Sequence, residues 1–185
     1  MTREWTDRIV GQLEFYWDVH LWPRLRGLTD EEYLWKPVEG MWSLSEHEGN
    51  WVLDGGWDPD SQPATATTIA WRMMHIAAPG LHNRAQAFFG DDPHPDLEMN
   101  DWHRMPATLP TTADEGVAFL AEKYKWWHDG IAALDDESVL RPLGPKGGEY
   151  AKDSMADLVV HINREIMHHG GEIGVLRDLY RAGLR

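Results

Sequence analysis

Cysteine is absent from all 185 residues of the chain. Without cysteine there is no disulfide, no thiol nucleophile of the protein's own and no sulfur-ligated zinc site. Any metal ion must therefore be held by histidine, aspartate or glutamate side chains.

Positive charge is also scarce: 17 Lys and Arg stand against 31 Asp and Glu, and the formal net charge is -14. Nucleic acid is bound through clustered Lys and Arg, so we expect no nucleic-acid partner. The same acidic balance argues against adsorption to an anionic lipid surface.

Long apolar runs are missing as well. No run approaches the roughly 18 residues of a membrane-spanning helix. The N-terminal sequence MTREWTDRIV carries scattered charges in place of the apolar stretch of a signal peptide. We therefore predict a cytoplasmic protein with no membrane partner. Eleven Trp and a 42% hydrophobic share are enough for one core, and residues 1–185 are predicted to form a single domain.

Apolar residues recur at helical spacing in four long segments, at about 3–25, 67–89, 112–134 and 154–180. Helix-capping residues precede a short helix and the last two long ones: Thr29 with Glu32, Thr112 with Glu115, and Ser154 with Asp157. No clear strand is predicted. The fold class expected from this pattern is an all-α four-helix bundle, with at least one crossover connection.

The segments between these helices, 38–64, 90–110 and 135–153, are predicted to be long loops. Trp42, Trp51 and Trp57 favour an ordered first loop, because disordered segments are poor in aromatic residues. Pro79 interrupts the second long helix. Its ring nitrogen cannot donate to the carbonyl of His75, so a kink is predicted one turn after His75.

Glu165 and His169 lie on the apolar track of the last helix, within about 40° of its centre. Burying a carboxylate and an imidazole there without partners would cost several kcal/mol. A divalent metal ion compensates both at once, because side chains at i and i+4 converge on one point. His75, on the face of the second helix that includes Trp71 and Ile76, is the best candidate for a third ligand.

Other interpretations of the same residues compete with this one. Arg164 replaces the first histidine of the zinc-protease pattern H-E-x-x-H, and no second E-x-x-H exists for a di-iron site. His75 alone could instead be a core histidine bonded to the backbone. Two histidines and one carboxylate leave a coordination position open, which is typical of a catalytic metal site.

Three further histidines lie close to these residues in the sequence. His168 points about 100° away from His169 and is expected to be exposed or to support the ligands. His161 could orient Glu165 through a hydrogen bond, or be a partly exposed surface residue. His82 could line a pocket or lie on the surface.

The sequence resembles the DinB-like superfamily of four-helix-bundle metalloproteins. The similarity is carried by residues 33–37 with 42–44, by residues 67–75, and by residues 161–173 with 176–180. The actinobacterial thiol-dependent branch looks most similar; it includes mycothiol S-transferases and the N-terminal domain of mycothiol-dependent maleylpyruvate isomerase. The family's ligand positions match His75, Glu165 and His169. Many relatives have His at the position of Glu165. Many also have Arg-Gly-Gln after the last ligand, where this chain has Gly170-Gly171-Glu172.

The resemblance implies a divalent metal ion as cofactor, with zinc expected first and nickel as the alternative. It also implies a low-molecular-weight thiol such as mycothiol, used for S-transfer to small-molecule electrophiles or for their isomerisation. Two rival hypotheses stay open: a metal-dependent hydrolase, and a non-catalytic helical protein that binds a metal or an apolar ligand. The sequence assigns no general base and leaves a homodimer open.

Overall fold

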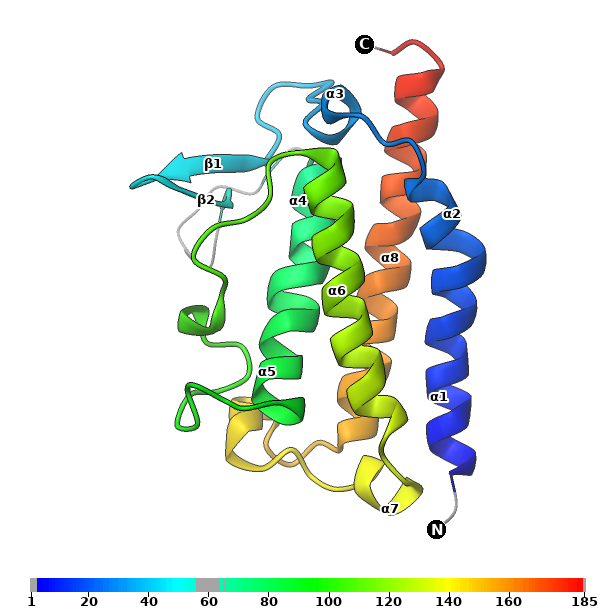
Figure 1. The fold of residues 1–185 in the computed structure, drawn as a ribbon, viewed down its shortest axis with the longest axis vertical. Coiled ribbons are helices and arrows are strands. Elements are labelled where there is room, and N and C mark those ends of the chain that lie inside the picture. The colour runs from blue at the N-terminus through cyan, green and yellow to red at the C-terminus, as the bar shows by residue number, and fades with distance from the viewer. Residues whose placement is uncertain (1–2, 56–63, 65, 185) are drawn as a thin grey trace.

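Four long helical segments pack side by side in the computed structural model, which describes residues 3–55, 64 and 66–184 (Figure 1). The first comprises α1 (Glu4–Phe15), a π-helical segment (Tyr16–Leu21) and α2 (Trp22–Leu25). The second comprises α4 (Ile69–His75), a π-helical segment (Ile76–His82) and α5 (Asn83–Phe89). The third and fourth are α6 (Ala113–Ala132) and α8 (Met155–Arg181). The predicted all-α bundle is confirmed.

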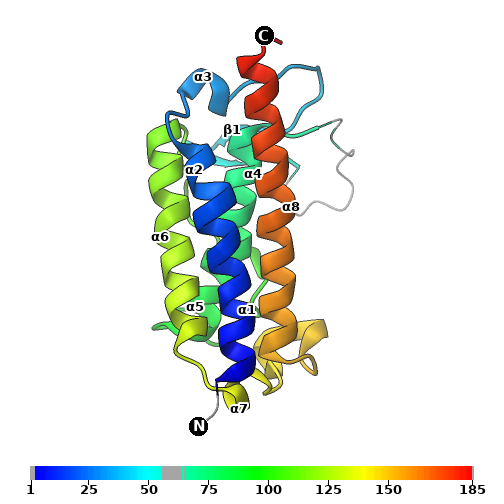
Figure 2. The ribbon, with the colours of Figure 1, turned by 90° about the vertical axis from the view of Figure 1, so that its right-hand side faces the viewer.

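Within the described part of the chain, one segment outside the helices crosses the length of the bundle. In Figure 1, α1 runs upward, α4 and α5 run downward, and residues 90–112 return to the upper end, where α6 begins. Both α6 and α4 therefore run downward, and α8 runs upward. Figure 2 shows α1 between α6 and α8, with α4 behind it. The predicted crossover is this return segment.

Short elements lie between the long helical segments; the first is the predicted short helix, and the others occupy segments predicted to be loops. They are α3 (Asp30–Tyr33), β1 (Leu44–His47), β2 (Asn50–Leu53), 3-10 helices at Trp102–Arg104 and Gly144–Tyr150, and α7 (Asp136–Val139). The expectation of no strand is therefore wrong. Strands β1 and β2 pair antiparallel across a two-residue turn in which Glu48 and Gly49 both have positive φ, 52° and 81°. Such a turn is usually indicated by Asn-Gly or Asp-Gly in the sequence. This chain has Glu48-Gly49 there, so the turn was not predicted. Trp57 lies outside the described residues.

Helix starts follow their predicted caps. The Thr29 hydroxyl accepts from the backbone N–H of Glu32, and Thr112 and Ser154 do the same for the third residues of α6 and α8. The carboxylates of Glu32 and Asp157 accept in return from the backbone of Thr29 and Ser154. These bonds satisfy N–H groups that have no partner inside the helix.

The predicted kink at Pro79 falls within the π-helical segment Ile76–His82. A π-helical turn is a common way for a helix to absorb an interruption of its hydrogen-bond ladder. The carbonyl oxygen of Pro79 also accepts a hydrogen bond from the guanidinium of Arg84. The irregular turn therefore separates His75, at the end of α4, from Arg84 on α5.

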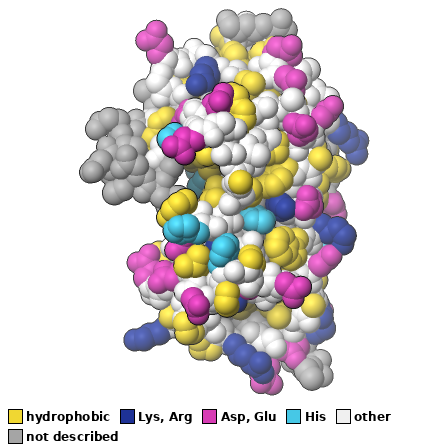
Figure 3. Space-filling model, turned by 60° about the vertical axis from the view of Figure 1, so that its left-hand side comes forward, with side chains coloured by type: hydrophobic (Ala, Val, Ile, Leu, Met, Phe, Trp, Pro, Cys, Tyr) yellow, Lys and Arg dark blue, Asp and Glu magenta, His cyan; other side chains and the backbone are white. Residues whose placement is uncertain are grey.

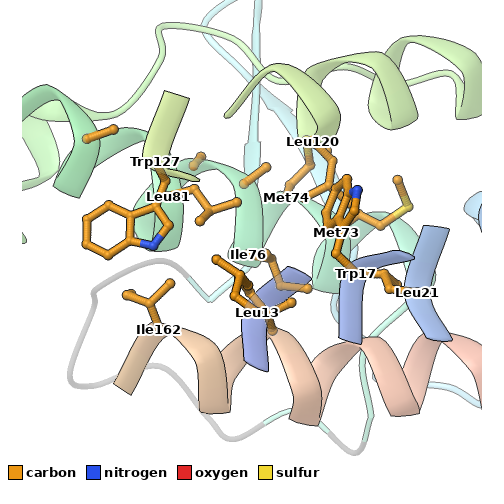
Figure 4. Packing of buried hydrophobic residues seen from close by; sticks show 14 of the residues in the cluster. Leu13, Trp17, Leu21, Met73, Met74, Ile76, Leu81, Leu120, Trp127 and Ile162 are labelled. Carbon is orange, nitrogen blue, oxygen red and sulfur yellow. The ribbon is translucent and has the colours of Figure 1, made fainter. Parts of the chain in front are cut away.

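The core lies along the axis between the four helical segments (Figure 4). Every helical segment contributes to it, and the buried residues include Leu13, Trp17, Met73, Ile76, Leu81, Leu120, Trp127 and Ile162. Among the described residues, no helix combines the length and apolar character that crossing a bilayer requires. Figure 3 shows acidic side chains spread over one face of the surface, with only scattered basic ones.

A buried ion pair fastens α3 to the upper end of α8. The guanidinium of Arg177 donates to both carboxylate oxygens of Glu32, at 3.1 and 2.9 Å, and both side chains are almost fully buried. Arg177 also donates to the backbone carbonyls of Arg24 and Arg26, where the first helical segment ends. This one side chain therefore joins three parts of the fold.

Candidate metal centre

The structure brings the three predicted ligands together. His75 is the last residue of α4, and Glu165 and His169 lie one turn apart on α8, which packs against α4. Oε2 of Glu165 lies 3.7 Å from Nε2 of His75 and 3.5 Å from Nε2 of His169. All three potential ligand atoms lie within 4.8 Å of one another.

The distances from Glu165 to the two histidines fit ligands of one shared metal ion better than direct hydrogen bonds. Hydrogen bonds between such atoms are normally about 2.7–3.2 Å long. Ligand atoms about 2.0–2.2 Å from a tetrahedral zinc ion lie roughly 3.3–3.6 Å apart. The 3.5 Å separation of Glu165 from His169 lies within this range, and the 3.7 Å separation from His75 lies just above it.

The second nitrogen of His169 has its own partner, Glu172. The Nδ1 group donates to Oε2 of Glu172 at 2.8 Å, and the guanidinium of Arg72 forms an ion pair with the same oxygen. A carboxylate bound to the far nitrogen fixes the histidine tautomer and leaves Nε2 free to coordinate a metal. Arg72, only 12% exposed, balances the charge of Glu172.

The protonation states also suit a cation. The neighbouring His75 ring is the main cause that lowers the pKa of Glu165 to about 2; burial opposes this effect, and the charges of His161 and His169 add to it. Burial is the main cause that lowers the pKa of His169 to about 4. At neutral pH the carboxylate is therefore ionised and the His169 ring is neutral, which are the forms that bind a divalent ion.

The site is open to solvent on one side. The side chains of His75 and Glu165 are 29% and 33% exposed, so the cluster lies at the edge of the core, not inside it as the helical pattern suggested. The Trp71 indole stacks on the His75 imidazole, with ring centroids 4.8 Å apart and planes at 9°. Trp71 thus packs against one face of the His75 ring, while the side chains of His75 and Glu165 remain partly exposed.

A second group of potential ligands overlaps the first. His168, His169 and Glu172 also place their ligand atoms within 4.8 Å of one another. Glu172, however, is already bound by Arg72 and by the Nδ1 group of His169. Among the described residues, no Lys or Arg forms an ion pair with Glu165, and we take the His75, Glu165 and His169 group as the candidate centre.

The other histidines have separate surroundings. His168 is 66% exposed, in agreement with its predicted direction. Nδ1 of His161 accepts a hydrogen bond from Arg164 at 3.0 Å, so the alternative of a partly exposed residue fits His161 better than a bond to Glu165. His82 lies against Trp126, and burial is the main cause that lowers its pKa to about 4.

A model of the DinB superfamily matches residues 12–173, which include all three candidate ligands. The chain belongs to the DinB superfamily. Comparison with curated proteins and with solved structures gave no match. The family match does not specify a reaction, which has to be inferred from the site itself.

The pair formed by Arg72 and Glu172 in this DinB protein was not predicted from the sequence. The sequence did indicate that Glu172 is near His169, because Glu172 lies three residues later and such side chains are neighbours on a helix. Arg72 likewise lies three residues before His75. Their meeting depends on how α4 and α8 are rotated against each other, and helical spacing alone does not determine that.

Proposed function

We propose that this DinB protein is a metal-dependent enzyme that transfers a low-molecular-weight thiol, of the mycothiol kind, to small electrophiles. His75, Glu165 and His169 hold one divalent ion, with zinc as the first candidate and nickel as the second. The observation that carries the proposal is the convergence of these three ligand atoms at an accessible site, with His169 oriented by Glu172. A bound divalent ion lowers the pKa of a thiol or a water molecule.

The chain's own residues have distinct parts in this proposal. The ionised carboxylate of Glu165 offsets charge in the site, while Arg72 and Glu172 hold the His169 ring in one orientation. Because the chain has no cysteine, the nucleophilic sulfur comes from a small molecule. In the net reaction the sulfur forms a bond to an electrophilic carbon, and the leaving group departs with the thiol proton.

Thiol-dependent turnover is the direct test. Metal-loaded protein should convert small electrophiles in the presence of mycothiol, bacillithiol or glutathione, and His75→Ala should abolish this activity. Steady-state assays that omit the thiol, the metal or the protein in turn provide the controls. Turnover that persists without thiol would favour hydrolysis, and no turnover by metal-loaded protein would favour a binding protein.

Metal content and its dependence on Glu172 test the centre without an activity assay. We expect about one divalent ion per chain, because the three ligands form one site. Glu172→Gln should weaken metal affinity by roughly 10–100-fold while the helix content stays unchanged, because the substitution loosens the orientation of His169.

Competition with a chromophoric chelator measures this change in affinity. Asp178→Asn is the matched control, because Asp178 is an exposed carboxylate on the same helix that pairs with Arg24. An affinity of Glu172→Gln equal to that of the control would remove Glu172 from the centre.

A further inference from the structure

Arg84 is a mostly buried arginine without a carboxylate partner among the described residues. Its guanidinium donates to the carbonyl of Pro79, but Nε is buried and has no hydrogen-bond partner. Burial is the main cause that lowers the pKa of Arg84 to about 10, and the charge of Glu165 partly opposes it, so the side chain is still charged at neutral pH. An unpaired buried charge is costly, and proteins normally compensate it.

The other buried arginines show how this protein compensates such a charge. Arg104 pairs with Asp92 at 2.7 Å, and Arg177 pairs with Glu32 at 2.9 Å. Arg84 differs from both in a chain whose net charge is -14 and in which carboxylates are abundant. The charge of Glu165 acts on Arg84, but no carboxylate of the described residues forms a direct ion pair with it. The guanidinium is therefore left with room for a directly bound anion.

Arg84 lines a cavity of about 930 Å³ at the end of the bundle where α8 begins. This volume is within the range of about 300–1,000 Å³ that small-molecule pockets occupy. Apolar side chains form much of the wall, among them Trp5, Ile9, Leu143 and Val160. The cavity thus combines apolar wall residues, of which Trp5 and Val160 are also exposed to solvent, with a guanidinium that has no direct ion-pair partner among the described residues.

Other polar side chains line the same cavity, among them His161, Arg164 and three carboxylates. Arg164 donates to Nδ1 of His161, so a neutral His161 ring carries its proton on Nε2 and can donate from there. Glu149, Asp153 and Asp157 also line the cavity, but all three are exposed, and Asp157 is engaged by the cap of α8. These rim carboxylates disfavour a ligand with two negative charges.

We propose that this cavity binds a small molecule with one carboxylate on an apolar body, and that Arg84 pairs with that carboxylate. A planar guanidinium matches a carboxylate with two parallel hydrogen bonds. His161 lies one turn before Glu165, so the bound molecule would lie beside the candidate metal centre. The inference goes beyond the proposed function, and it holds whether or not the metal centre is catalytic.

Phenylacetate and its neutral analogue phenylacetamide are suitable probes. Calorimetry on the protein as purified should show the carboxylate binding at least about tenfold more tightly than the amide, because only the carboxylate pairs with Arg84. The preference should persist after chelator treatment and vanish in Arg84→Met. Arg141→Met is the matched control, since Arg141 is exposed, pairs with Glu137 and lies outside the cavity.

Arg164→Glu is a second variant on the exposed rim and does not remove a buried group. It should weaken phenylacetate binding and leave phenylacetamide binding unchanged. If Arg84→Met does not fold, this variant tests whether the carboxylate binds in the cavity. A preference that is lost on chelation and retained in Arg84→Met would assign the carboxylate to the metal centre and overturn the proposal. Equal binding of the two probes by wild-type protein would overturn it as well.

Discussion

Replacing His169 with alanine should abolish metal binding, whereas replacing the adjacent His168 should leave most of it. His169 is 13% exposed and directs Nε2 toward Glu165, while His168 is 66% exposed on another face of α8. Loss of a ligand should exceed the roughly 10–100-fold that supporting residues contribute to metal affinity. Isothermal titration with zinc and with nickel, on protein purified without an affinity-tag metal, measures both variants.

The same pair of variants separates the two overlapping ligand groups. His169 belongs to both groups, but His168 belongs only to the group that includes Glu172. Equal losses of affinity in the two variants would place the ion between His168, His169 and Glu172 instead. Circular dichroism should show that both variants keep their helices, because neither histidine belongs to the buried apolar cluster.

Local signals made much of the fold and the ligand set predictable. Thr29, Thr112 and Ser154 each carry a cap that involves residues three positions apart, so their partners are visible in the sequence. Glu165 and His169 are also one turn apart, and helical geometry alone places them side by side. His75 needed the further step that two helices of a bundle face each other.

Long-range relations were less accessible to prediction. Arg72 and Glu172 lie 100 residues apart and meet because of the way α4 packs on α8. The lack of a direct ion pair at Arg84 is harder still to predict, because it depends on where several neighbouring elements place their carboxylates. The β1–β2 turn was missed for a local reason. Glu48 adopts a positive φ, and Asn or Gly at that position would have indicated the turn in the sequence.

Glu32→Gln should destabilise the fold by about 3–5 kcal/mol, the typical cost of leaving a buried charge without its partner. Gln keeps the shape of the side chain but leaves the guanidinium of Arg177 buried and unneutralised between α3 and α8. Urea denaturation of metal-free protein measures the loss. Glu4→Gln is the control, because the pair between Glu4 and Arg8 is largely exposed and should change stability by less than about 1 kcal/mol.

The dependence of this loss on pH identifies its origin. Burial raises the pKa of Glu32, but hydrogen bonds and charge from Arg177, with help from Thr29 and Arg181, outweigh burial and leave the pKa below its ordinary value of 4.5. A carboxylate with a lowered folded-state pKa contributes stability above its unfolded pKa, and that contribution is lost as the pH falls through the folded value. The difference between wild type and Glu32→Gln should therefore be full at neutral pH and shrink below about pH 4.5. A constant difference across this range would mean that Glu32 acts through packing and not through its charge.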